Sequence, residues 1–157
     1  MFGQLTREQI EEVLTKQLVG RIGCHADNIT YVVPTSYAYH DNTIYCHTYE
    51  GMKLNMMKQN PQVCFEVDVL ENLSDWKSVI AWGKFEEITK EADRKDALQI
   101  LLNRSLPFIT SKTMQFGDDW PFTASTTENI NGVLFKIQLK NKTGRYEMGD
   151  AVRNERH

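Results

Sequence analysis

Apolar and polar residues alternate with a period of two over much of the chain from residue 19 to about residue 70. This is the spacing of β-strands that bury one face. Polar residues interrupt it at Asp27-Asn28 and at His40-Asp41-Asn42, where tight turns are favoured. The pattern predicts short antiparallel strands over residues 19–25, 29–39, 43–48 and 62–70, with two more over 76–89 and 132–141.

Three segments have helical character instead, over residues 6–18, 51–60 and 92–106. Thr6 and Gln9 have capping-box spacing, Gly20 offers a stop for the first helix, and Asn60-Pro61 ends the second. The chain lacks both the alternation of strands and helices and the glycine-rich motif of doubly wound nucleotide-binding sheets. We therefore expect a mainly β protein, a small closed β-barrel with peripheral α-helices, because closure removes exposed sheet edges.

Two residues break the expected strands in an informative way. Pro34 lies inside the segment 29–39, and proline cannot donate a ladder hydrogen bond. It therefore marks a sheet edge, a bulge, or a place where something other than a strand pairs. Gly83 marks a second possible bulge. Trp76 and Trp82 are an even number of residues apart, so they share a strand face unless a bulge intervenes.

No linker, repeat or low-complexity stretch divides the 157 residues, so we expect one domain over residues 1–157. The net charge of −3 is not the basic balance typical of a nucleic-acid-binding protein. No apolar run reaches the ~18 residues of a membrane helix, and the glutamate-containing N-terminus does not resemble a signal peptide. Three cysteines without a CxxC pair favour a reducing, cytoplasmic location.

The pairs Cys24-His25 and Cys46-His47 have the residue types of a zinc site. Zinc needs four ligands that converge tetrahedrally. Neighbouring residues on a strand point to opposite faces, so two strands bring only two of these ligands together. We therefore expect no metal site, and we expect the cysteines to pack in the barrel wall.

A better candidate site runs from Tyr45 to Lys53. Here a strand ends in polar residues, a glycine follows, and a helix begins. A helix N-terminus offers unpaired N–H groups and a positive dipole end, and His47, Thr48 and Lys53 add donors at the same place. By chemistry alone this indicates an anion site, with a plain turn and a solvated lysine as the alternative.

These segments resemble the flavin-binding split-barrel proteins related to pyridoxamine 5′-phosphate oxidase, especially the nitroimidazole-resistance branch. The resemblance covers roughly residues 5–90 and is weaker from 91 to 157. It rests on GRIG at 20–23, YVVPTS at 31–36, YCHTYEGMK at 45–53, NPQVCFEV at 60–67, WKSV at 76–79 before Gly83, and TGRYE at 143–147.

The resemblance implies a homodimer of six-stranded antiparallel Greek-key split barrels, with FMN in two equivalent interface clefts. His47, Thr48, Gly51 and Lys53 would hold the phosphate. The backbone of Pro34, Thr35 and Ser36 would lie along the flavin ring, Ser78 and Val79 would approach the ring edge from the second subunit, and Arg21 and Trp120 would line the site.

The sequence departs from the oxidase branch at three places. Gly51 stands where that branch has serine, and His47-Thr48 stands where it has Thr-Asn. The C-terminal segment that binds its substrate has no counterpart after Gly144. These departures predict a substrate other than pyridoxamine phosphate.

The expected function is therefore that of an FMN-binding oxidoreductase of small molecules, similar to a nitroimidazole reductase, with FAD as a possible cofactor and reduced nicotinamide as a possible electron donor. His47 is the candidate acid or base, since its unperturbed pKa is about 6.5. A flavin-binding or redox-sensing module without turnover is an alternative. Another is a barrel that binds a deazaflavin, or a haem with His25, His40 or His47 as axial ligand.

Overall fold

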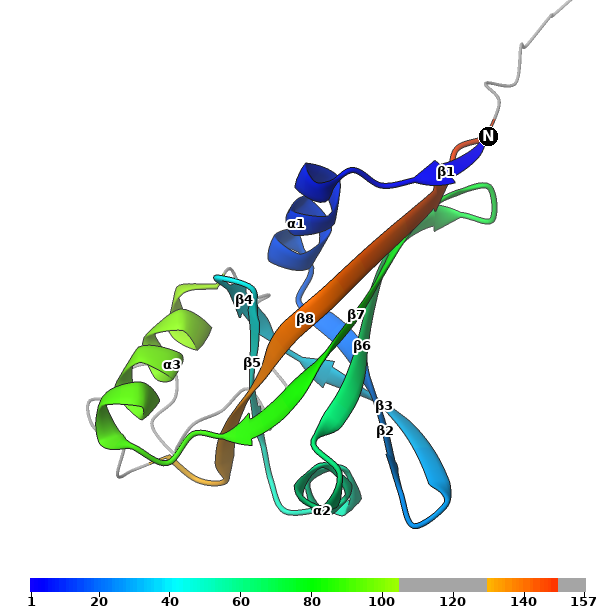
Figure 1. Cartoon of the computed structure of the whole chain (residues 1–157). Coiled ribbons are helices and arrows are strands. Elements are labelled where there is room, and N and C mark those ends of the chain that lie inside the picture. Colours follow the sequence, from blue (N-terminus) through cyan, green and yellow to red (C-terminus); the bar gives the residue numbers. More distant parts are fainter. Residues whose placement is uncertain (105–129, 150–157) are drawn as a thin grey trace, which may run out of the picture.

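The computed structural model describes residues 1–104 and 130–149. Eight strands form one antiparallel sheet, and three helices lie around it (Figure 1). The strands are β1 (Phe2–Gln4), β2 (Val19–Ala26), β3 (Ile29–Ser36), β4 (Ala38–His40), β5 (Thr43–Thr48), β6 (Gln62–Asn72), β7 (Asp75–Glu87) and β8 (Val133–Glu147). The helices are α1 (Arg7–Lys16), α2 (Met52–Gln59) and α3 (Glu91–Asn103).

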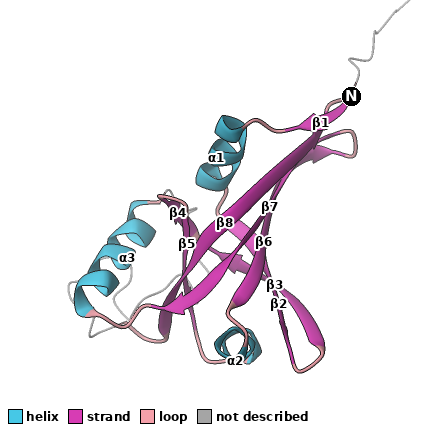
Figure 2. Ribbon diagram, in the orientation of Figure 1, coloured by secondary structure: helices cyan, strands magenta, loops and turns pink. Residues whose placement is uncertain are grey.

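The sheet has the order β3-β2-β6-β7-β8-β5-β4, with β1 added to β8. We refer to β6, β7 and β8 as the closed wall, because these strands of 11, 13 and 15 residues pair along most of their length (Figure 2). The order begins at β3 and ends at β5 with the short β4 beside it, and β3 does not pair with β5. We refer to this gap between β3 and β5 as the split. The predicted mainly β split barrel is confirmed; β2, β3, β5, β6, β7 and β8 form it, and β1 and β4 are short additions.

The predicted turns are confirmed by backbone geometry. Asp27 and Asn28 have φ of 52° and 61°, and Asp41 and Asn42 have φ of 47° and 58°. Two consecutive residues with positive φ are typical of the tight hairpins whose twist matches that of the flanking strands. Asparagine and aspartate tolerate this region better than other non-glycine residues, so the local sequence accounts for both hairpins.

Pro34 and Gly83 lie where their chemistry is tolerated. Pro34 is on β3, the edge strand at one end of the sheet, where its missing N–H costs no ladder bond on the free side. The register of β7 against β8 shifts between Trp82 and Gly83. A Cβ on Gly83 would lie 2.4 Å from the backbone oxygen of Gln138, so the bulge needs a glycine.

The helix boundaries are close to the prediction. Thr6 and Gln9 form the predicted capping box: the Gln9 N–H donates to Thr6 Oγ1 over 3.2 Å, and the Thr6 N–H donates to Gln9 Oε1 over 2.8 Å. The predicted role of Gly20 as a stop is wrong, since α1 ends at Lys16 and Gly20 lies in β2. There the Phe65 ring occupies the space that a Cβ would need.

Three strands differ from the prediction. The expected strand 29–39 divides at Tyr37, because the Tyr37 N–H donates to the Leu18 carbonyl over 3.0 Å and its hydroxyl donates to the Leu14 carbonyl over 2.7 Å. The last strand continues to Glu147 and pairs there with β1, which has no sequence signal of its own. Only long-range pairing explains β1 and this extension.

The buried side chains form two separate cores. The larger one fills the barrel and includes Phe65, Phe135 and Ile137. The smaller one lies on the other face of β5 and β8 and includes Leu101 and Leu134. The helix α3 covers this second face and lies beside β4 and β5 (Figure 1). Adjacent residues of β5 therefore point into different cores.

Candidate functional site

The N-terminus of α2 has the features of an anion site. Gly51 is the N-cap residue, and no side chain caps the first turn. Lys53 lies in that turn and is half-buried. Within the described part of the chain it has no hydrogen-bond or ion-pair partner, and burial lowers its pKa. A half-desolvated ammonium beside uncapped N–H groups favours a negatively charged ligand at this point.

The split brings Thr35 of β3 and Cys46 of β5 together. Burial raises the pKa of the Cys46 thiol to about 12, while the charges of Lys53 and Arg104 and a hydrogen bond with Thr35 act in the opposite direction. Cys46 is fully buried and Thr35 is nearly so. Thr35 and Cys46 therefore lie close together across the split, and Lys53 of α2 and Arg104 at the end of α3 lie within electrostatic range of the thiol.

Pro34 and Ser36 do not share the orientation of Thr35. The Pro34 side chain is exposed, Ser36 is half-buried, and Thr35 points into the barrel. The free side of an edge strand carries backbone groups without ladder partners, and β3 is such an edge. Residues 34–36 thus offer backbone groups beside the split, and their predicted contact with a flavin ring stays a prediction.

The His47 side chain points to the opposite face of β5 from the side chain of its neighbour Cys46, and therefore away from Thr35. Its ring is 2% exposed on the side of β5 that α3 covers, and its Nε2 bonds to the Asn131 carbonyl. The Tyr49 ring meets it edge-on at 5.3 Å between centroids. Thr48 is buried and alternates with His47. The side chains of His47 and Thr48 therefore do not converge on one point. His47, the predicted acid or base, already bonds to a backbone carbonyl of this protein.

Gly132 lies against His47 and Thr48 at the end of β5, and the sequence prediction did not include it. Its φ is +87°, and a Cβ there would lie 2.5 Å from the Thr48 carbonyl oxygen and 3.0 Å from His47 Nε2. Only glycine fits a left-handed turn so close to other backbone. The Asn131-Gly132 pair, a strong turn dipeptide, was the available signal.

Ser78 and Val79 lie on opposite faces of β7. Val79 is fully buried in the barrel, so its side chain is not available to a ligand. Ser78 is on the outer face, where its hydroxyl donates to Glu66 Oε1 over 3.3 Å. Of the two predicted residues, only Ser78 presents a side chain outside the barrel.

The outer face of the sheet carries a charged cluster that the sequence prediction did not identify, apart from Arg21. Arg21 Nη1 lies 2.8 Å from Asp68 Oδ1 and 3.4 Å from Glu66 Oε2. The hydrogen bond to Asp68 raises the pKa of Arg21. Burial, and then the nearby Asp68 charge, raise the pKa of Glu66. Glu66 and Asp68 alternate with Phe65 and Val67 along β6. This alternation was the sequence signal that both carboxylates lie on one face of the strand.

Apolar side chains surround this charged cluster. Two cross-strand rows run over the outer face, Pro34–Arg21–Glu66–Ile80 and Val32–Gly23–Cys64–Trp82. Val32 is 65% exposed and Trp82 is 42% exposed. Exposed apolar side chains gathered on one face of a protein, with polar residues beside them, mark a candidate surface for protein–protein contact.

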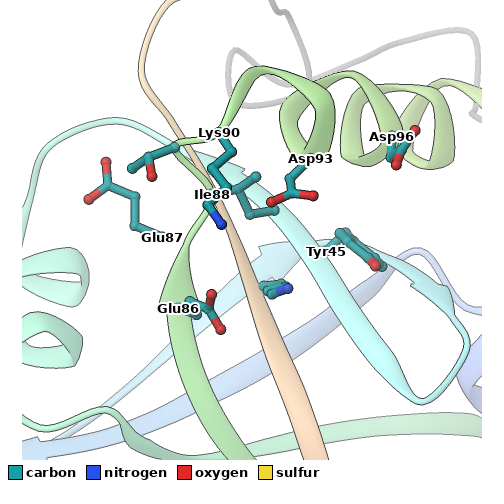
Figure 3. Close-up of a pocket in the computed structure, with 9 residues that line it drawn as sticks. Tyr45, Glu86, Glu87, Ile88, Lys90, Asp93 and Asp96 are labelled. Carbon is teal, nitrogen blue, oxygen red and sulfur yellow. The ribbon is translucent and has the colours of Figure 1, made fainter.

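A different pocket, of about 160 Å³, lies where β7 leads into α3 (Figure 3). Its lining is acidic and includes Glu86, Glu87, Asp93 and Asp96. Of the predicted segment from Tyr45 to Lys53, only Tyr45 lines this pocket. The described residues contain no cluster of His, Cys, Asp and Glu suited to a metal ion. Cys24 is buried and His25 is exposed, so these neighbouring residues of β2 point to opposite faces of the strand.

Three further points concern features that the sequence analysis predicts. None of the helices in residues 1–104 and 130–149 has the length and hydropathy needed to span a membrane. All three cysteines are free thiols. Trp120, a predicted lining residue, lies outside the described residues.

Known proteins resemble this chain in sequence and in fold. An uncharacterised protein of Rhizobium meliloti (strain 1021) is 31% identical over 84 residues, which is 54% of this chain and 56% of that protein, so the match spans little more than half of its length. The structure of an FAD-binding protein from Mesorhizobium loti has a TM-score of 0.70 and 30% identity, covering 93% of this chain and 98% of that one.

A candidate 5-nitroimidazole antibiotic resistance protein from Bacteroides thetaiotaomicron shares the fold, with a TM-score of 0.70, 20% identity, and coverage of 93% of this chain and 87% of that one. The sequence model of the pyridoxamine 5′-phosphate oxidase family matches residues 6–145. That match spans the barrel from the N-cap of α1 into β8. The chain therefore belongs to the pyridoxamine 5′-phosphate oxidase family.

Proposed function

We propose that this protein binds a flavin nucleotide at the split, with the phosphate at the N-terminus of α2 and the ring along the edge of β3. The observation that carries the proposal is Lys53, a half-buried cation without a partner among the described residues, in an uncapped first helical turn. The FAD-binding protein of Mesorhizobium loti, at 30% identity, supports a flavin ligand.

The residues at the split fit this ligand. Lys53 and the first N–H groups of α2 would bind the phosphate, and Gly51 leaves the approach open, since a Cβ there would meet nothing within 4 Å. The backbone of Pro34–Ser36 would bond the polar edge of the ring from the free side of β3. His47 would act indirectly, by holding the Asn131–Gly132 turn against Thr48.

The proposal includes a homodimer that forms through the outer face of the sheet. The exposed apolar residues Val32, Ile80 and Trp82 support it, as does their place beside Pro34 and Ser78 in the cross-strand rows. Ser78 of each chain would then approach the ligand of the other. Light scattering on the protein with Trp82→Glu tests this part: the wild type should be a dimer and the variant a monomer, and a monomeric wild type that binds flavin tightly would contradict it.

The proposed activity is oxidation–reduction of a small molecule. A bound flavin supplies hydride and single-electron chemistry, while the protein supplies binding, orientation and exclusion of water. A reduced nicotinamide is the proposed electron donor, and a nitro compound is the acceptor to test first, given the resistance protein that shares the fold. The chain's own contribution is to hold the ring at the split and to leave one of its faces open to the substrate.

The test begins with the visible absorption spectrum of the purified protein and the mass of any small molecule released by heat. A flavin spectrum is expected, and the mass then distinguishes FMN from FAD. A Soret band would instead indicate haem. A colourless protein that takes up neither added flavin would overturn the proposal. Loss of the absorbance of reduced nicotinamide only when a nitro compound is added would then separate an oxidoreductase from a flavin carrier.

A further inference from the structure

A cavity of about 500 Å³ lies between the end of α1, strand β4 and the end of α3. Its lining includes Leu18, Tyr37, His40, Ile100 and Arg104. Small-molecule sites generally have volumes of about 300–1,000 Å³. Tyr37 follows directly after Ser36, so the chain that lines this cavity continues from the edge strand assigned to the flavin ring.

The charge of this cavity is opposite to that of the pocket at the start of α3. Its described lining contains Lys16 and Arg104 and no aspartate or glutamate. The pocket in Figure 3 contains four carboxylates, and the chain as a whole has a net charge of −3. Lys16 is exposed and paired with Glu12, so Arg104 is the cation of the described lining that can attract an anionic ligand.

Arg104 has hydrogen-bonding capacity that the protein does not use. Its Nε and Nη1 atoms are buried and have no hydrogen-bond partner among the described residues. Burial lowers the pKa of the guanidinium, and no carboxylate of the described residues opposes this effect. A buried guanidinium without a partner is strongly unfavourable. Such unsatisfied groups are rare in proteins and each requires an explanation.

The Cys46 thiol connects this cation with the proposed flavin site. Both Arg104 and Lys53 oppose the rise in the pKa of Cys46, so both charges lie within electrostatic range of one buried atom. Lys53 is assigned to the flavin phosphate above. Arg104 is therefore a second unpaired cation near the same cleft, on the side of the cavity.

We propose that the cavity beside Arg104 binds a small organic anion, and that this anion is the substrate of the flavin. Arg104 would hold a carboxylate or phosphate group, because the planar guanidinium matches the geometry of both. Leu18, Tyr37 and Ile100 would contact the apolar part of the same molecule. The substrate assignment rests on the proposed flavin function, but the anion site does not.

The first experiment is calorimetric titration of the full-length protein, without flavin, with benzoate and with phenyl phosphate at constant ionic strength. The wild type should bind at least one probe, and the preference between them identifies the anionic group. Arg104→Gln should weaken that binding at least ten-fold. Lys95→Gln is the matched control, because Lys95 is an exposed cation on the same helix that does not line the cavity. Equal binding by the wild type and Arg104→Gln, or no binding of either probe by the wild type, would overturn the proposal.

Thermal unfolding without any anion is a second test. It distinguishes an arginine that binds a ligand from an arginine that stabilises the fold. Removing a buried charge that lacks a partner should leave Tm unchanged or raise it, so Arg104→Met should be at least as stable as the wild type. Phenyl phosphate or benzoate should raise Tm of the wild type and not of the variant. A clear fall in Tm of Arg104→Met would show that the guanidinium has a structural partner, and would overturn the proposal.

Flavin titration separates the two proposals. Arg104→Gln should bind flavin as the wild type does, because Lys53 and α2 are unchanged. If the wild type bound the anionic probes through Arg104 but bound no flavin, the proposed function and the substrate role would both be wrong, and the anion site would stand.

Discussion

The closed wall and the split differ in how completely their polar groups are paired. In the wall, β7 pairs with β6 on one side and with β8 on the other. At the split, β3 ends the sheet, α2 begins without a side-chain cap, and Lys53 and Arg104 have no partner among the described residues. The closed wall therefore pairs its backbone groups within the sheet, whereas the split leaves backbone groups and two cations available to a ligand.

This difference separates stability from binding within one small barrel. Buried apolar area and paired backbone stabilise the wall. Partly desolvated cations at the split lower the stability of the protein on its own, and such groups are retained where they bind a ligand. Substitutions in the wall should therefore change the free energy of unfolding, and substitutions at the split should change ligand affinity.

The largest expected effect is in the core against the wall. Phe135 is fully buried and packs against Phe85 with ring centroids 5.4 Å apart. Phe135→Ala should lower the free energy of unfolding by about 3–5 kcal/mol, through lost burial and the cavity that remains. Urea unfolding measures it, with Leu73→Ala as the control, because the Leu73 side chain is 90% exposed. A loss as small as that of the control would contradict the assignment of stability to the wall.

A pair of glycine substitutions compares the two sides directly. A Cβ on Gly83 would lie 2.4 Å from backbone in β8, whereas a Cβ on Gly51 would meet nothing within 4 Å. Gly83→Ala should cost about 1–3 kcal/mol through overpacking, while Gly51→Ala should be nearly neutral for stability. Chemical denaturation of both variants tests this, and similar losses in the two would remove the contrast.

Lysine substitutions on α2 test the split. Lys53→Ala should weaken flavin binding about ten-fold or more, equivalent to about 1.4 kcal/mol, because it removes the partly buried cation from the first turn. Lys58→Ala is the control, since Lys58 is more exposed and lies 3.8 Å from Glu87. Fluorescence titration with FMN and FAD measures both variants. Equal losses would argue against the phosphate position.

The smallest expected effect concerns pH and the outer face. The pKa of Glu66 is raised in the folded protein, chiefly by burial. A raised pKa means that its contribution to stability is greatest below the unfolded pKa of about 4.3 and is lost as pH rises through the folded pKa. Glu66→Gln should therefore gain stability relative to the wild type between about pH 4 and pH 7, by no more than about 1 kcal/mol.

Urea unfolding of both proteins over this pH range measures the effect on Glu66. Arg21 retains Asp68 at 2.8 Å in the variant, so loss of that ion pair does not obscure the result. A relative stability that is constant with pH would show that the carboxyl group of Glu66 titrates normally.

Local signals in the sequence predicted much of the fold because they act over a few residues. The Thr6–Gln9 capping box formed as predicted. The Asp27-Asn28 and Asp41-Asn42 turns adopted positive φ, and Asn60 ended α2. Motif spacing also indicated the family, and the family match over residues 6–145 confirmed it.

The site was only partly predictable, because it depends on which face each strand turns to a neighbour. The motif YCHTYEGMK brought His47 and Lys53 into one hypothesis, yet the structure buries His47 under α3 and leaves Lys53 near the split. Alternation alone separates His47 from Cys46 but does not say which of them faces the barrel. The roles of Glu66 and Arg104 also needed the packing of distant strands and helices.

The sequence by itself determined most of the strands, both hairpin turns, the start of α1, the end of α2 and the family, since each depends on interactions along the chain or on motif spacing. Only the tertiary structure decided that Tyr37 bonds to the Leu14 and Leu18 carbonyls and that β8 extends to pair with β1. It also decided that Lys53 and Arg104 lie near the buried Cys46 thiol with no partner among the described residues. Partnerships between distant residues form only when the sheet assembles, so no local pattern encodes whether a cation is paired.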